Sequence, residues 1–109
     1  MQINVKQMLE ETGLKVAENC FLRAPTLPYI VFLEEENNSG ADNKICLSER
    51  DITVELYSRK IDREKEIQLE EILIKNYIEF RKNRTWIDSE KVFQTVYDFN
   101  LYEKKRRSK

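Results

Sequence analysis

Carboxylates are the side chains of this chain best suited to do chemistry, and the stretch "ITVELYSRKIDREKE" places several of them where a strand is predicted to run into a helix. Strand-to-helix joints carry the reactive groups of many enzymes. Asp51, Glu55 and Asp62 surround this joint, but they belong to different kinds of structure and are not expected to converge. Asp62 has a simpler role as the N-cap of the following helix. The pattern therefore favours a scaffold over a catalytic site.

Other catalytic arrangements lack their residues. The chain has no histidine, which excludes a Ser-His-Asp triad, a Cys-His pair and histidine metal sites. Its two glycines are too far apart to form a phosphate-binding loop. The acidic runs "LEEENN" and "QLEEIL" are predicted to be solvated surface. The single Glu-x-Lys pattern, Glu103 to Lys105, lies near the end of the chain, where an ordered nuclease site is not expected. We expect a protein that is not an enzyme and has no cofactor or metal.

Composition indicates one soluble domain with a modest core, because 109 residues are 40 % hydrophobic and 36 % charged. Neither a signal peptide nor a membrane span is expected. Cys20 and Cys46 match no metal-ligand spacing and are expected to be buried, reduced thiols.

Charge is unevenly distributed along the chain. The last six residues, "KKRRSK", hold five of the 19 Lys and Arg, so the other 103 residues carry 14 basic and 20 acidic groups. We expect a single domain at 1–103 and a flexible basic tail at 104–109. Such a tail is either a frayed terminus or a contact to nucleic acid or an acidic partner. The candidate contact residues are Lys104, Lys105, Arg106, Arg107 and Lys109.

Hydrophobic periodicity predicts the elements of the first half. A helix begins after Asn4 and stops at Gly13, and strands cover 14–22 and 29–36. The polar run 36–44 is predicted to be a long protruding hairpin loop. A long strand at 44–59 changes the phase of its apolar positions, which predicts a bulge between Ser48 and Asp51.

The second half has a helix from Arg63 to about Asn76, then strands at 77–83 and 91–103 joined by "TWIDSE". The fold class is therefore α+β, with the order α-β-β-β-α-β-β and an antiparallel sheet of about four to five strands carrying two helices. A double-stranded-RNA-binding domain begins with a similar order. That class needs lysines at the start of its second helix, whereas this helix opens with the net acidic "DREKE".

Four segments together resemble the tail terminator, or tail-completion, proteins of long-tailed phages and prophages of Gram-positive bacteria. They are "GLKVAEN", "PYIVFLEEENNSGADNK", "ITVELYSRKIDREKE" and "TWIDSEKVFQTVYDF". The resemblance runs from the first helix to Tyr102. None of its motifs is catalytic, and "KKRRSK" is not part of the pattern.

The resemblance implies a structural role and a fold similar to that of tail-tube proteins. Such proteins form a ring, commonly a hexamer, at the head-proximal end of the tail in the virion, after synthesis in the host cytoplasm. Their partners are other copies of the chain, the tail tube protein and the head-completion or connector protein. DNA passes through the ring without specific binding, and no membrane is involved. An acidic channel wall would agree with such passage.

Three groups of residues are candidates for contacts in such an assembly. Ile67 and Ile74 lie outside the main apolar stripe of the second helix, and are either the edge of a broad buried face or a subunit contact. Trp86 and Ile87 are a second candidate contact, with simple core burial as the alternative for Trp86. The candidate hairpin residues are Asn37, Asn38, Ser39, Gly40, Ala41 and Asp42.

Two other functions remain open from the sequence. One is a head-completion or neck protein, which differs from a terminator in the neighbour it contacts. The other is a small nucleic-acid-binding protein that uses the basic tail.

Overall fold

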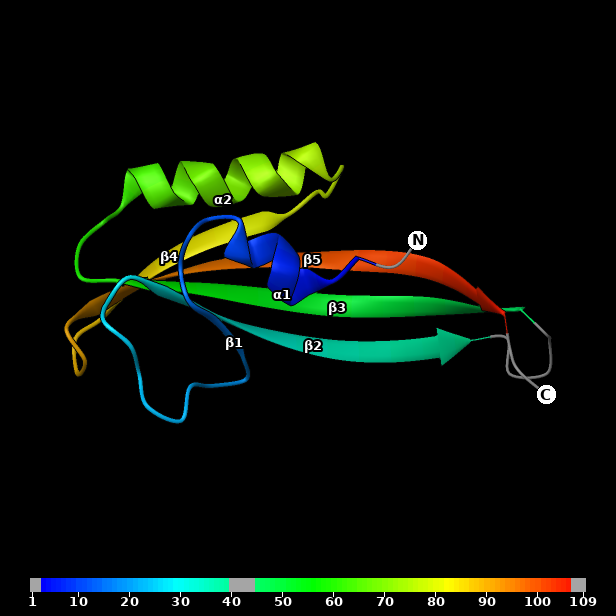
Figure 1. Ribbon diagram of the computed structural model, residues 1–109, viewed down its shortest axis with the longest axis horizontal. Helices are drawn as coiled ribbons and strands as arrows, with labels where there is room; N and C mark the ends of the chain where they lie inside the picture. Colours follow the sequence, from blue (N-terminus) through cyan, green and yellow to red (C-terminus); the bar gives the residue numbers. More distant parts are fainter. Residues whose placement is uncertain (1–2, 40–44, 107–109) are drawn as a thin grey trace.

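The computed structural model describes residues 3–39 and 45–106, which form a five-stranded sheet with both helices packed on one face (Figure 1). The spatial order of the strands is β1-β2-β3-β5-β4; β1 runs parallel to β2 and the other neighbours are antiparallel. This confirms the predicted α+β class and the order α-β-β-β-α-β-β. The elements are α1 Val5–Glu10, β1 Val16–Glu18, β2 Tyr29–Ser39, β3 Ile45–Ser58, α2 Arg63–Lys75, β4 Arg81–Ile87 and β5 Val92–Arg106.

Both helices begin at the residues that the sequence indicated. The Asn4 side chain accepts a hydrogen bond from the Gln7 N–H at 3.0 Å, and Asp62 accepts one from the Lys65 N–H at 3.1 Å. Gly13 follows α1 with a φ of +82°, a conformation that glycine adopts without a steric penalty. Local capping chemistry therefore sets where each helix starts and how α1 ends.

The core lies between the helices and one face of the sheet, called here the helix-covered face. Because strand side chains alternate, every second residue of β2, β3 and β5 points into this core. The residues between them form the opposite side, called the helix-free face. The main core residues are Val5, Met8, Leu9, Ile30, Phe32, Ile52, Val54, Leu56, Leu69, Ile72, Leu73, Tyr97, Phe99 and Leu101.

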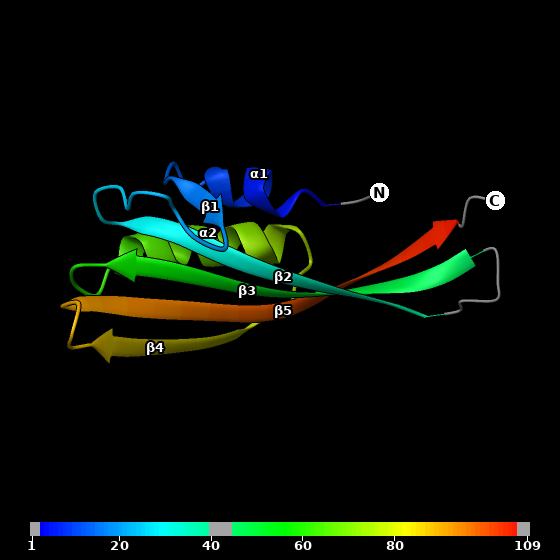
Figure 2. The same ribbon diagram turned by 90° about the horizontal axis from the view of Figure 1, so that it is seen from below.

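The three long strands continue past the helices (Figures 1 and 2). We call residues 33–39 of β2, 45–52 of β3 and 99–106 of β5 the extension, and the rest of the sheet with its helices the body. β5 has 15 residues, or about 50 Å at ~3.3 Å per residue, and the longest dimension of the molecule is 49 Å. β1 pairs only with 30–32 of β2, and β4 only with 92–98 of β5, so neither reaches the extension.

The predicted bulge in β3 is wrong. Pairing with β2 and with β5 is continuous in register along the strand. The buried row of β3 simply becomes polar beyond Ile52, where Arg50 and Ser48 are both buried. The sequence appeared to change phase because charged and hydroxyl side chains fill core positions there.

Three strand boundaries also differ from the predictions. The first strand is limited to Val16–Glu18, and Asn19 turns the chain with a φ of 70°. β4 is Arg81–Ile87 rather than 77–83, so Trp86 belongs to the strand and not to a connection. β5 continues to Arg106, past the boundary expected at residue 103. β5 extends further than predicted because β3 supplies hydrogen-bonding partners as far as Ile45, which local propensity does not show.

Candidate assembly surfaces

The helix-free face is aromatic at one end. The rings of Phe21 and Tyr29 meet edge to face with centroids 5.4 Å apart, and Tyr29 lies 5.4 Å from Tyr57. The Tyr57 hydroxyl donates to Glu55 Oε1 at 2.9 Å and accepts from Gln94 Nε2 at 2.9 Å. Burial and the neighbouring Glu55 carboxylate raise the pKa of Tyr57 to about 12. Tyr57 therefore remains protonated and acts as a hydrogen-bond donor.

Five acidic side chains lie on the rest of the helix-free face, among neutral residues such as Thr53 and Asn100. We call this group the acidic face: Glu35, Glu49, Asp51, Glu55 and Asp98. Thr53 donates to Asp98 at 2.9 Å, and the Tyr102 hydroxyl donates to Glu49 at 3.2 Å. Within the part of the chain that the structure describes, none of the five carboxylates forms an ion pair. Arg81 lies directly opposite Asp98 in the register of β4 and β5, so a base shares this face with the carboxylates, although no ion pair joins the two among the described residues.

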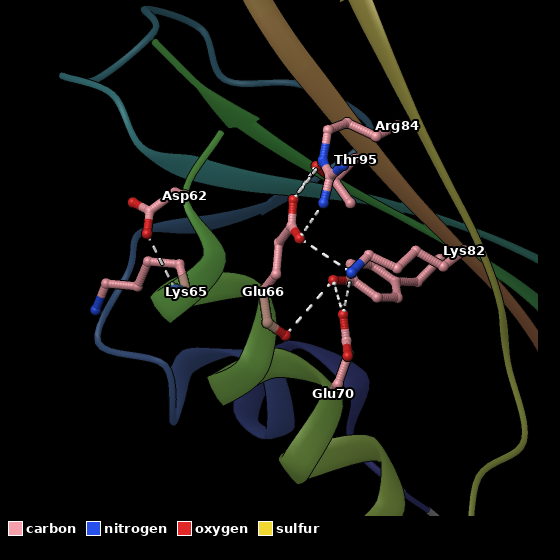
Figure 3. Close-up of polar contacts among 8 residues, drawn as sticks. Asp62, Lys65, Glu66, Glu70, Lys82, Arg84 and Thr95 are labelled. Carbon is pink, nitrogen blue, oxygen red and sulfur yellow. Dashed lines mark hydrogen bonds and ion pairs between the residues drawn. The ribbon is translucent and has the colours of Figure 1, made fainter. Parts of the chain in front are cut away.

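The helix-covered face contains a buried charge cluster that links α2 to β4 and β5 (Figure 3). Glu66 is 2 % exposed and accepts from Arg84 Nε at 2.9 Å and from the Thr95 hydroxyl at 3.0 Å, with Lys82 Nζ 3.0 Å away. Burial raises the pKa of Glu66, but the hydrogen bonds from Arg84, Lys82 and Thr95 outweigh it and hold the pKa at about 2. Glu66 is therefore ionised, and its carboxylate already binds Arg84, Lys82 and Thr95. A carboxylate in this state holds α2 to β4 and β5 and is not suited to act as a general acid.

Glu70 extends this cluster by one helical turn. The Tyr97 hydroxyl donates to Glu70 Oε2 at 2.8 Å, and Lys82 Nζ lies 2.6 Å from the same oxygen. Burial and the Glu70 carboxylate raise the pKa of Tyr97. The expectation that "QLEEIL" is solvated surface is wrong for Glu70, which is half-buried, whereas Glu71 is exposed.

A second buried charge lies in the extension. Arg50 is 4 % exposed; its Nε donates to Glu34 at 2.6 Å, and its Nη1 donates to Glu103 at 2.8 Å and to the Ile3 carbonyl at 2.9 Å. These bonds raise the pKa of Arg50 against the opposing effect of burial. Beside it the Ser48 hydroxyl donates to Glu36 at 2.6 Å. Arg50 thus ties β2, β3, β5 and the segment before α1 together.

The four residues predicted for an interface are at least partly accessible, and they occupy two places. Ile67 and Ile74 are 54 % and 63 % exposed on the outer side of α2, so they are not the edge of a buried face. Trp86 is 44 % exposed, which excludes the core-burial alternative, and its ring lies 4.8 Å from that of Phe93. Ile87, which precedes the turn to β5, is half-buried.

The predicted hairpin and tail are placed only in part. Asn37, Asn38 and Ser39 belong to β2 and pair with β3, so they are not loop residues. Gly40, Ala41 and Asp42 lie outside the described residues. Lys104, Lys105 and Arg106 belong to β5 and pair with 45–47 of β3, so these three continue the sheet. Arg107 and Lys109 lie outside the described residues.

A cleft of about 700 Å³ runs along the outer side of β5 where β4 has ended. Its walls are the 76–81 segment between α2 and β4, and the strand from Asp98 to Tyr102. Tyr77 and Tyr102 beside it are 96 % and 61 % exposed. Sequence reasoning missed this cleft, because it depends on where β4 stops pairing.

The described residues hold no group of three or more metal-ligating His, Cys, Asp or Glu side chains. Neither helix among them is long and apolar enough to cross a membrane. Cys20, expected to be buried, is exposed.

No family model and no curated protein matches the chain. Among solved structures, its fold is similar to that of a chain in the virion of a native gene transfer agent particle, with a TM-score of 0.58. The similarity covers 89 % of this chain and 84 % of that one, at 8 % sequence identity. At this identity the likeness shows a shared fold.

Proposed function

We propose that the chain is a non-enzymatic structural protein of a phage-like virion, and that it acts as a ring-forming tail terminator. The observation that carries the proposal is the similarity of fold, over most of both chains, to a component of a gene transfer agent virion. The four segments that resemble tail terminators point to the same assembly independently.

The acidic face supports a role as channel wall. Five carboxylates without ion-pair partners among the described residues give this side of the sheet a negative potential. DNA phosphates are repelled by such a surface, so DNA would pass along it without being held. In this arrangement the helix-free face lines the opening and the helices lie outside.

A ring contact joins two different patches of neighbouring copies, because a rotation closes it. The exposed pair Ile67 and Ile74 is one such patch, and Trp86 with Ile87 is another. The two ends of the ring are left to contact the tail tube protein and the head connector.

Deleting the gene tests the terminator role. Loss of a terminator is expected to give overlong tails without heads, because nothing stops growth of the tube. Tails of normal length beside unjoined heads would contradict termination and support the neck-protein alternative. Salt-sensitive DNA binding by the purified chain that is lost on truncation after Glu103, with tails unaffected, would support a nucleic-acid-binding role.

The double variant Ile67→Glu and Ile74→Glu tests the helix patch. Both side chains are more than half exposed, so the free energy of unfolding should change by about 0.5 kcal/mol or less. If the patch is a subunit contact, light scattering should show a smaller species. Arg63→Glu on the same helix adds the same change in charge and is the matched control. An unchanged oligomer in the double variant would exclude this patch.

A further inference from the structure

Tyr77 has an unusual backbone conformation for its residue type. It follows α2 with a φ of 60°, in the left-handed region that glycine adopts freely and other residues adopt at a cost. Its N–H donates to the Ile74 carbonyl at 2.9 Å. The Ile78 N–H donates to the Leu73 carbonyl at 2.9 Å. These two hydrogen bonds close a helix at a position where glycine is common, so glycine would serve this helix end at least as well as tyrosine.

The Tyr77 ring has no packing role that would offset this cost. The residue is 96 % exposed. No ring pair and no cation–π contact among the described residues includes its ring. A large aromatic side chain that is exposed and held in a strained conformation points to a contact with another molecule.

Tyr77 lines the 700 Å³ cleft that lies between β5 and the segment joining α2 to β4 (Figure 1). Other residues of the lining are apolar: Ile78 and Leu101 are buried, and Phe80 is half-buried. The volume is that of an ordinary ligand pocket. The cleft therefore combines an exposed aromatic ring with an apolar floor and has room for a few residues of an extended chain.

The charges of the lining favour a cation. Glu79, Arg81 and Asp98 line the cleft and are exposed, and two acids against one base leave a net negative charge. Neither carboxylate forms an ion pair among the described residues, although Arg81 lies opposite Asp98 in the strand register. The C-terminal end of α2 meets the cleft at Asn76 and adds the partial negative charge of a helix end.

We propose that this cleft binds an extended segment of a partner protein that carries arginine or lysine. The cation stacks on the Tyr77 ring and pairs with Glu79 or Asp98, while apolar groups of the same segment contact the floor. An acidic segment would meet like charges at this site, which makes a basic one the better fit. The site does not depend on the tail-terminator role, because it assigns a binding chemistry to the isolated chain.

Tyr77→Gly separates binding from folding. Glycine relieves the left-handed strain and loses more backbone entropy on folding, so the net effect should be a rise in Tm of about 3 °C. Circular dichroism during heating measures the Tm, and Tyr77→Phe, which keeps both the ring and the conformation, is the matched control. A Tm below that of wild type would show that the ring stabilises the fold, and would overturn the case for a binding role.

Peptide binding tests the chemistry of the site. The probes are a labelled peptide of sequence KKRRSK and one of sequence EEEESE, and fluorescence anisotropy with the purified chain measures their affinities. The basic peptide should bind at least about tenfold more tightly than the acidic one, and Tyr77→Gly should weaken its binding by about fivefold. Tyr77→Phe should bind as wild type does. Equal affinity of wild type and Tyr77→Gly would overturn the proposal.

A second comparison distinguishes the cleft from general attraction to an acidic chain. Glu79→Gln should weaken binding of the basic peptide by about threefold, because it removes a carboxylate from the lining. Glu64→Gln removes the same charge from an exposed position in the first turn of α2 and should leave binding unchanged. Equal losses in the two variants would mean that the peptide is held by overall charge, and would overturn the site.

These outcomes are distinguishable from those of the proposed function. Overlong tails on gene deletion, together with no preference for the basic peptide, would overturn the cleft and leave the terminator role standing. Binding at the cleft in a phage whose tails keep normal length without the gene would support the site and reject termination. Self-association that is lost on truncation after Arg106 and blocked by the basic peptide would make a second copy the occupant, and would overturn the assignment to a partner protein.

Discussion

The body and the extension contain the same three long strands, but different elements cover these strands in the two regions. In the body, helices cover one face and β1 and β4 flank the outer strands. In the extension, no described strand pairs with β2 beyond Phe32 or with β5 beyond Asp98, and the buried row of β3 changes from Ile52 to Arg50 and Ser48. Each region nevertheless buries one charge, Glu66 in the body and Arg50 in the extension.

The difference shows which polar groups serve folding. Both buried charges are saturated by partners from neighbouring strands or helices, so they stabilise the chain internally. The extension differs in its flanks: among the described residues, pairing with β1 ends at Phe32 and pairing with β4 ends at Asp98.

The largest expected effect comes from Arg50→Met. It leaves Glu34 and Glu103 without their shared cation at a buried position, and should lower the free energy of unfolding by about 3 kcal/mol. Chemical denaturation measures the change, and Arg59→Met at an exposed position is the matched control. If the free energy of unfolding falls by less than about 1 kcal/mol, the Arg50 ion pairs contribute no more than exposed surface ion pairs do.

Glu66→Gln should have the next largest effect, about 2 kcal/mol, because it removes the anion that Arg84 and Lys82 share. Glu71→Gln on the exposed side of α2 is the control.

The Glu66 contribution should also depend on pH. The pKa of Glu66 is lowered from 4.5 to about 2, so the folded state favours the ionised form. Its stabilisation is complete above pH 4.5 and is lost as pH falls toward 2. The stability difference between wild type and Glu66→Gln should therefore narrow over that range. A difference independent of pH would show that lost packing, and not charge, causes the effect.

The smallest expected effect is a gain from Glu35→Gln. Glu35 lies directly opposite Asp51 on the helix-free face, and like charges in such pairs are destabilising. The variant should raise the free energy of unfolding by about 0.3 kcal/mol at low salt, and the gain should shrink as salt is added. If the variant instead lowers the free energy of unfolding, the charge of Glu35 is balanced by basic groups of the same chain. Glu18→Gln, exposed at the end of β1, is a control.

The sequence predicted the fold class and the helix starts because these depend on local signals. Asn4, Asp62 and Gly13 act through their own backbone neighbours, and Leu69, Ile72 and Leu73 repeat with the helical period. The site was harder to predict. Ile67 and Ile74 lie outside the main stripe and are exposed, and their role as a contact stays a prediction. Arg50 and Glu66 look like ordinary surface charges in the sequence.

Strand lengths and edges could not be predicted from residue types alone. The sequence predicts a loop at Asn37–Ser39 and a tail at Lys104–Arg106, yet both segments pair with β3. Local propensity does not show this, because the hydrogen bonds come from a neighbouring strand. The bulge predicted in β3 is wrong for a related reason. An ionised arginine fills a core position once two carboxylates from other strands meet it.

By itself, the sequence determined the α+β fold class and the residue types available for chemistry, which include no histidine, since both follow from local periodicity and composition. Tertiary structure alone decided which charges are buried, where pairing with β1 and β4 ends, and that five carboxylates share one face. The physical reason is that these properties belong to pairs of strands far apart in the sequence. Only their register in the sheet brings the residues together.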